Sequence, residues 1–67
     1  MSLKSDNLRF KAVHDYNAQR SDELTFRVND IIEDVIIHSG GWAFGKVGPK
    51  SGLFPLIHAI ELNDGDA

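Results

Sequence analysis

The 67-residue chain contains no cysteine. This absence excludes a disulfide-stabilised scaffold and every zinc site built from thiolates, which are the usual supports of small secreted domains. It favours a reducing compartment, so we expect a cytoplasmic protein.

Clustered positive charge and long apolar runs are also missing. Seven basic residues are scattered singly against ten acidic ones, and the formal net charge is −3. A nucleic-acid partner is therefore not expected, because phosphate binding needs a basic face. The longest apolar stretches, residues 31–37 and 53–60, are interrupted and fall short of the roughly 20 residues that span a bilayer. Residues 1–5 do not resemble a signal peptide. We expect no membrane insertion.

The length allows one small domain, and 42% hydrophobic residues allow a thin core. We expect a polar N-terminal tail over residues 1–8 that is in part an expression scar, a folded domain over residues 9–63, and a C-terminal tail over residues 64–67. A unit this small is expected to be one module of a longer protein, and a monomer in isolation.

Short alternating segments dominate the rest of the chain. Residues 8–13, 23–28, 31–37, 42–47, 53–54 and 60–62 have strand patterns, and turn residues separate them. Asn29 stands at a reversal and tolerates the left-handed backbone region. The sequence predicts an all-β fold, a small antiparallel barrel with a long polar connection between Val13 and Leu24. The expected core or close-packing positions are Ala12, Leu24, Phe26, Ile32, Val35, Gly45, Val47, Gly52, Phe54 and Ala59.

Four sequence motifs in a fixed order carry a family resemblance. They are AVHDY at residues 12–16, DELTF at residues 22–26, a Gly-Trp pair at residues 41–42 followed by Gly45, and GLFP at residues 52–55. Together with VNDII at residues 28–32, they make residues 9–63 resemble a Src homology 3 (SH3) domain. The resemblance implies a five-stranded barrel with RT, n-Src and distal loops and a short 3-10 turn.

The resemblance also implies a function and a site. The family binds extended, usually proline-rich peptides in the polyproline II conformation, within a groove of aromatic side chains. Such a peptide is already extended, so little ordering entropy is lost on binding. The implied domain belongs to an adaptor, cytoskeletal or signalling protein. The residues that match the groove are His14, Tyr16, Trp42, Pro55, Ile57 and His58. The implied receptors of a ligand Arg or Lys are Asp22 and Glu23, although by themselves they also fit a solvated loop tip.

Several groove positions depart from the family pattern. His14 and His58 stand where tyrosines are usual, Ile57 replaces an asparagine, and Phe44 replaces a polar residue on the same strand face as Trp42. By pattern alone Trp42 fits core or groove, and Phe44 fits a contact under a loop or an exposed patch. An alternative function follows, in which Trp42, Phe44, Ile57 and His58 form an apolar patch for a folded partner or for weak self-association.

Catalysis and cofactors are not expected. The histidines suggest acid–base chemistry, but no nucleophile elbow, phosphate loop or metal-ligand spacing accompanies them. Two histidines do not complete a zinc coordination shell. If His14 and His58 share one pocket, their protonation below about pH 6.5 predicts weaker proline binding in acid.

Overall fold

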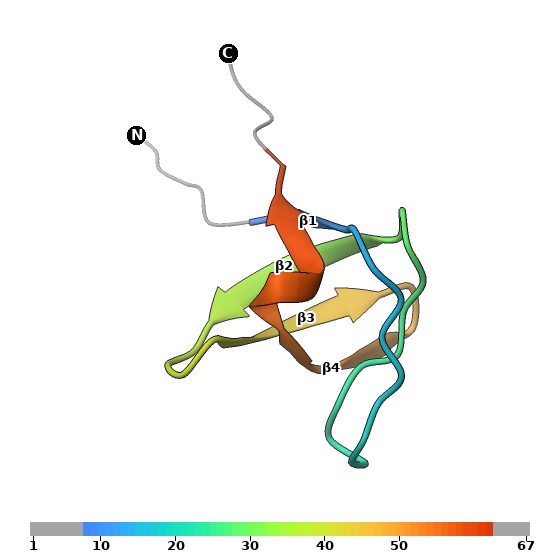
Figure 1. The fold of residues 1–67 in the computed structure, drawn as a ribbon, viewed down its shortest axis with the longest axis vertical. Coiled ribbons are helices and arrows are strands. Elements are labelled where there is room, and N and C mark those ends of the chain that lie inside the picture. The colour runs from blue at the N-terminus through green and yellow to red at the C-terminus, as the bar shows by residue number, and fades with distance from the viewer. Residues whose placement is uncertain (1–7, 63–67) are drawn as a thin grey trace.

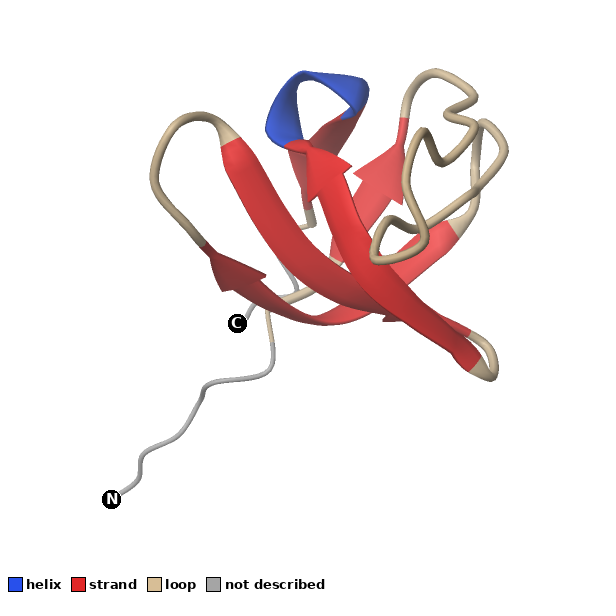
Figure 2. Cartoon of the chain, turned by 90° about the horizontal axis from the view of Figure 1, so that it is seen from below, coloured by secondary structure: helices blue, strands red, loops and turns tan. Residues whose placement is uncertain are grey.

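A computed structural model describes residues 8–62 as a single antiparallel β-sheet that curls on itself (Figure 1). The strands are β1 (Phe10–Ala12), β2 (Ile31–Ile37), β3 (Trp42–Val47), β4 (Lys50–Pro55) and β5 (Ala59–Glu61), and a 3-10 turn, η1 (Leu56–His58), joins β4 to β5. The strand order is β4-β3-β2-β1-β5. Figure 2 shows the strands curving around one another. The predicted all-β architecture with a 3-10 turn is confirmed.

The two central hairpins follow the turn chemistry of the sequence. Gly40 and Gly41 have φ of 73° and 84° between β2 and β3, and Gly48 has φ of 59° between β3 and β4. Asn29, at the expected reversal, has φ of 79°. Residues 31–37 and 42–47 have the predicted bounds, whereas the short strand at 53–54 extends back to Lys50. Within the described residues, no helix is long and apolar enough to cross a membrane.

The strand predicted over residues 23–28 is wrong as a continuous element. Phe26 bridges Tyr16 in an antiparallel sense, while Glu23 bridges Leu53 in a parallel sense. The Leu24 amide donates to the Leu53 carbonyl at 2.8 Å, and the Leu53 amide donates to the Asp22 carbonyl at 2.9 Å. The two ends of this segment thus pair with different partners, so no ladder can form along it. The pairing with β4 fixes one side of the long loop, residues 13–30.

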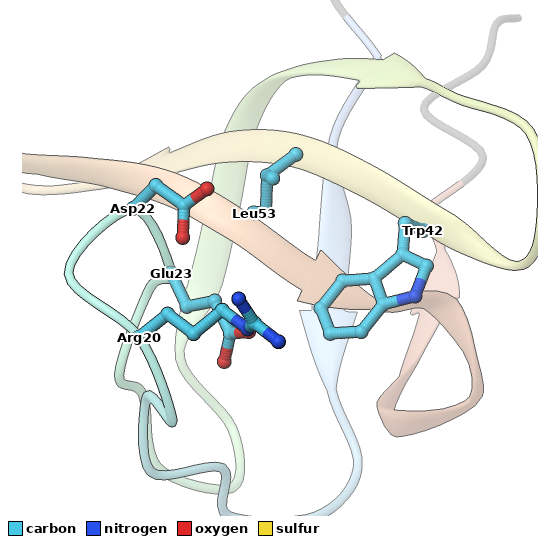
Figure 3. Close-up of a pocket in the computed structure, with 5 residues that line it drawn as sticks. All are labelled: Arg20, Asp22, Glu23, Trp42 and Leu53. Carbon is cyan, nitrogen blue, oxygen red and sulfur yellow. The ribbon is translucent and has the colours of Figure 1, made fainter.

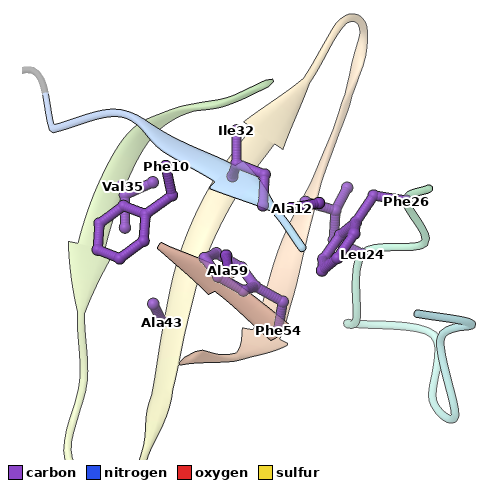
Figure 4. Close-up of a cluster of buried hydrophobic side chains, with 9 residues drawn as sticks. All are labelled: Phe10, Ala12, Leu24, Phe26, Ile32, Val35, Ala43, Phe54 and Ala59. Carbon is purple, nitrogen blue, oxygen red and sulfur yellow. The ribbon is translucent and has the colours of Figure 1, made fainter. Parts of the chain in front are cut away.

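The hydrophobic core lies between the curled strands and the base of the long loop (Figure 4). Phe54 is its centre, with Phe26 and Phe10 in edge-to-face contact at ring distances of 5.7 and 6.4 Å. Val47, predicted as core, is half-buried. The buried side chains of the described residues are Phe10, Ala12, Leu24, Phe26, Ile32, Val35, Ala43, Phe54 and Ala59.

Leu8 belongs to the packed unit. This residue, assigned by sequence to the tail, packs against the core, and its carbonyl accepts the Val35 amide at 3.0 Å. The remainder of the two expected tails, residues 1–7 and 64–67, lies outside the described residues.

Candidate functional site

An open cavity of about 300 Å³ lies between the long loop and strands β3 and β4 (Figure 3). Its walls are Arg20, Asp22 and Glu23 from the loop, Trp42 from β3 and Leu53 from β4. We call this cavity the acidic pocket. It combines two carboxylates with an indole and an aliphatic side chain, which suits a cation attached to an apolar stem.

Trp42 owes its position to the hairpin it begins. It is the first residue of β3, follows the Gly40-Gly41 turn, and lies opposite Pro55 of β4. The side chain is half-buried and faces the cavity rather than the core. The next residue, Ala43, is fully buried in the core. Strand alternation therefore presents Trp42 to solvent at the pocket wall.

Glu23 is held by two hydrogen bonds to one carboxylate oxygen. The Tyr16 hydroxyl donates to Oε1 at 2.6 Å, and the Gln19 amide donates to Oε1 at 2.7 Å. The hydrogen bond from Tyr16, and to a smaller extent that from the Gln19 backbone amide, lowers the pKa of the Glu23 carboxyl. The same bond, with burial and the negative charge of Glu23, raises the pKa of Tyr16 to about 12. At neutral pH the carboxylate is ionised and the phenol is protonated.

Arg20 was not predicted by sequence, yet it lines the acidic pocket. Its guanidinium lies near Glu23 and Trp42 in Figure 3, and its charge contributes to the low pKa of Glu23. The available signal was its place two residues before Asp22, in the tip of the same loop. Leu53 was likewise missed as a pocket residue. The pocket thus already holds one cation beside its two acids.

A second cluster joins three predicted groove residues. His14 and His58 have ring centroids 5.7 Å apart, and Tyr16 lies 5.2 Å from His58, both pairs in edge-on contact. Turn η1 supplies His58, whose Nδ1 lies 3.2 Å from the Asp15 carbonyl oxygen. We call these three side chains the ring cluster. Because Tyr16 also bonds to Glu23, the ring cluster is connected directly to the acidic pocket.

The other predicted site residues belong to neither the acidic pocket nor the ring cluster as defined above. Pro55 is half-buried opposite Trp42, and Ile57 is 81% exposed on η1. Phe44 is half-buried and shares the outer face of β3 with Trp42, as strand alternation predicts. Across residues 8–62, no group of three or more His, Cys, Asp or Glu side chains is placed to hold a metal ion.

Comparisons with known proteins agree on one family. A sequence model described as SH3 domain matches residues 11–56. The rat protein named 1-phosphatidylinositol 4,5-bisphosphate phosphodiesterase gamma-2 is 41% identical over 58 residues, covering 85% of this chain but only 5% of its own length. The chain therefore corresponds to a small part of such relatives.

Solved structures give the same result. The C-terminal SH3 domain of myosin IB from Entamoeba histolytica, bound to an EhFP10(GEF) peptide, has a TM-score of 0.81 at 30% identity, covering 90% of this chain and 100% of the other. The Acanthamoeba myosin I SH3 domain bound to Acan125 has a TM-score of 0.79 at 34% identity, covering 87% of this chain and 100% of the other.

The sequence motifs, the curled five-stranded sheet and these matches lead to one assignment. SH3 domains are generally non-catalytic. This chain belongs to the SH3 domain family, and it is therefore a protein–protein interaction module of the kind found in signalling and adaptor proteins.

Proposed function

We propose that this domain binds a short, extended, proline-rich peptide of a partner protein, with a basic residue of that peptide in the acidic pocket. The observation that carries the proposal is the connection through Tyr16. Its ring contacts His58 in the ring cluster, and its hydroxyl bonds to Glu23 in the acidic pocket. One extended ligand can therefore contact both regions at once.

Each region has a distinct role in this proposal. Glu23, ionised at neutral pH, and Asp22 attract the cation of a ligand Arg or Lys, whose stem and charge pack on the Trp42 indole. His14, Tyr16, His58 and Pro55 offer rigid apolar faces to proline rings. The myosin IB SH3 domain of Entamoeba histolytica, solved with a bound peptide, supports a peptide ligand in general.

The wider setting is also a proposal. We assign residues 9–63, together with Leu8, which packs against the core, as the module. We place it in a longer cytoplasmic protein of the signalling, adaptor or cytoskeletal kind. Support comes from the relatives, because the part that matches this chain is only 5% of the rat protein and 10% of human Nostrin.

The test uses labelled peptides with the pattern Arg-x-x-Pro-x-x-Pro and the same peptides with Gln in place of Arg. The natural domain should bind the Arg peptide more tightly. Trp42→Ala should weaken binding by at least about 30-fold, the loss typical of a central aromatic contact. Its fold should persist, because Trp42 lies outside the core.

The control is Ile60→Ala, which shortens an exposed side chain on β5. It should leave peptide affinity unchanged. Equal affinity of natural domain and Trp42→Ala would contradict the proposal. If circular dichroism shows that Trp42→Ala unfolds cooperatively at a much lower temperature than the natural domain, Trp42 instead supports the core.

A second candidate function is favoured by the exposure of Ile57, at 81%, and by Phe44 beside Trp42. In it, Trp42, Phe44, Ile57 and His58 contact a folded partner or a second copy of the domain. This candidate would be favoured if no proline-rich peptide bound to the domain, a folded partner did bind, and Ile57→Ser abolished the binding of that partner. Sedimentation equilibrium measures self-association directly.

A further inference from the structure

A row of apolar side chains crosses three strands on the outer face of the sheet. Leu53 of β4 pairs with Phe44 of β3, and Phe44 pairs with Ile36 of β2. Directly opposed residues in antiparallel strands have their side chains on the same face. Ile36 is 60% exposed, while Phe44 and Leu53 are half-buried. We call these three side chains the outer apolar row.

The outer apolar row begins at the acidic pocket. Leu53 belongs to both, and Trp42 precedes Phe44 by two residues, which places the two aromatic side chains on one face of β3. Further along the same face, Lys46 forms an ion pair with Asp34 at 3.3 Å. The row is therefore bounded by Trp42 on one side and by charges on the other. Apolar surface with a polar rim is typical of an interaction site.

The size of the row limits what can bind there. Strands in a sheet lie about 4.7–4.9 Å apart, so the row extends about 10 Å from β4 to β2. A stable interface between two folded proteins needs about 800 Å² from each partner, which three side chains cannot supply alone. An extended peptide already bound in the pocket needs no such area. It advances about 3.1–3.4 Å per residue and crosses the row in about three residues.

We propose that the outer apolar row binds a large aliphatic or aromatic side chain in the flank of the same peptide, about three residues beyond the basic residue and away from the prolines. This inference rests on the proposed peptide site. It adds a specificity element, since a ligand would be recognised by a basic residue followed at fixed spacing by an apolar one. Leu53 and Phe44 form the floor of this contact, and Ile36 is its far wall.

The test is a cycle of two peptides against three domains. Both peptides carry the basic residue and the prolines, and they differ only in having Leu or Ser three residues beyond the basic residue. The domains are the natural sequence, Ile36→Thr, and Ile60→Thr as the matched control. Ile60 is similarly exposed, at 54%, but pairs with Lys11 on β1, away from the pocket. Thr suits both strand positions, and circular dichroism checks the fold.

Leu should raise the affinity of the natural domain about three- to tenfold over Ser, the gain from burying about half of a leucine side chain. The gain should disappear in Ile36→Thr and persist in Ile60→Thr, while the Ser peptide binds all three domains equally. A gain that survives Ile36→Thr, or no gain in the natural domain, overturns the inference. Failure of both peptides to bind any domain refutes the proposed peptide site itself, and the extension with it.

Discussion

Gly52 lies where strand β4 touches the base of the long loop, and Gly52→Ala should damage both stability and binding. A Cβ added there would lie 2.7 Å from the Glu23 carbonyl carbon and 2.9 Å from the Leu24 amide nitrogen, all backbone atoms. Ordinary contacts begin at 3.4 Å, so loop and strand must separate by roughly 0.7 Å to relieve the overlap.

That separation has a calculable cost. The Leu24–Leu53 hydrogen bond, now 2.8 Å, would lengthen to about 3.5 Å, where little of its energy remains. Overpacking of about 1–3 kcal/mol and a weakened bond of about 0.5–1.5 kcal/mol together give a loss of about 1.5–4.5 kcal/mol in the free energy of unfolding. In a domain this small, each kcal/mol lowers Tm by about 4–8 °C. Glu23 also leaves its place in the pocket, so affinity for an Arg peptide should fall about two- to fivefold, the contribution of one exposed ion pair.

The assay combines thermal unfolding by circular dichroism with peptide titration at a temperature where the variant is folded. Gly45→Ala is the control, because the Cβ added there meets the side chains of Ile32, Phe54 and Val35 rather than the loop. It should lower Tm and leave affinity unchanged. A Tm of Gly52→Ala within about 3 °C of the natural value, or an unchanged affinity in a destabilised Gly52→Ala, would refute the reasoning.

The remaining predictions concern charge and protonation in the two clusters. The phenol of Tyr16, the single tyrosine, should titrate near pH 12 when followed by absorbance at 295 nm, and Glu23→Gln should lower its pKa back toward about 10. If Glu23→Gln and the natural domain gave the same titration curve, the hydrogen bond between Tyr16 and Glu23 would be absent in solution. Because the pKa of Glu23 is lowered in the folded state, Glu23 stabilises the folded domain above about pH 4.3. This contribution to stability is lost as the pH falls through the folded-state pKa. Chemical denaturation at several pH values should show that loss, smaller in Tyr16→Phe. Arg20→Gln should raise affinity for an Arg peptide about two- to fivefold at low salt, since a like charge leaves the pocket, and the gain should shrink in high salt.

The sequence predicted the bounds of strands β2 and β3 best. Residues 31–37 and 42–47 have β-branched or alternating patterns bounded by Asn29-Asp30 or by glycine turns, and the bounds of both strands are confirmed. The segment 23–28 has the same alternation, and Leu24 and Phe26 are indeed buried. An alternating apolar pattern predicts which side chains face the core, but it does not predict which neighbouring segment pairs with the strand through backbone hydrogen bonds. The error at 23–28 has that cause.

The site was predictable to the extent that motifs determine it. The resemblance selected Trp42, Asp22 and Glu23, which line one pocket, and His14, Tyr16 and His58, which lie in ring contact; their role in binding stays a prediction. Arg20 could not be found in this way. The direction of a side chain at a loop tip depends on the loop backbone, which here is fixed by pairing with β4, distant in sequence.

The pairing of β1 with β5 has a mechanical consequence. Phe10 lies opposite Glu61, and the Leu62 amide donates to the Arg9 carbonyl at 2.8 Å, so residues 9 and 62 are adjacent at one end of the ladder. Tension applied through these two points loads the Leu62–Arg9 bond first and the ladder bonds one after another. Strands pulled in this way peel apart, whereas strands pulled from opposite ends shear all their bonds together. A host protein under load would therefore open this domain at low force, starting at the β1–β5 edge and reaching η1 and the ring cluster next.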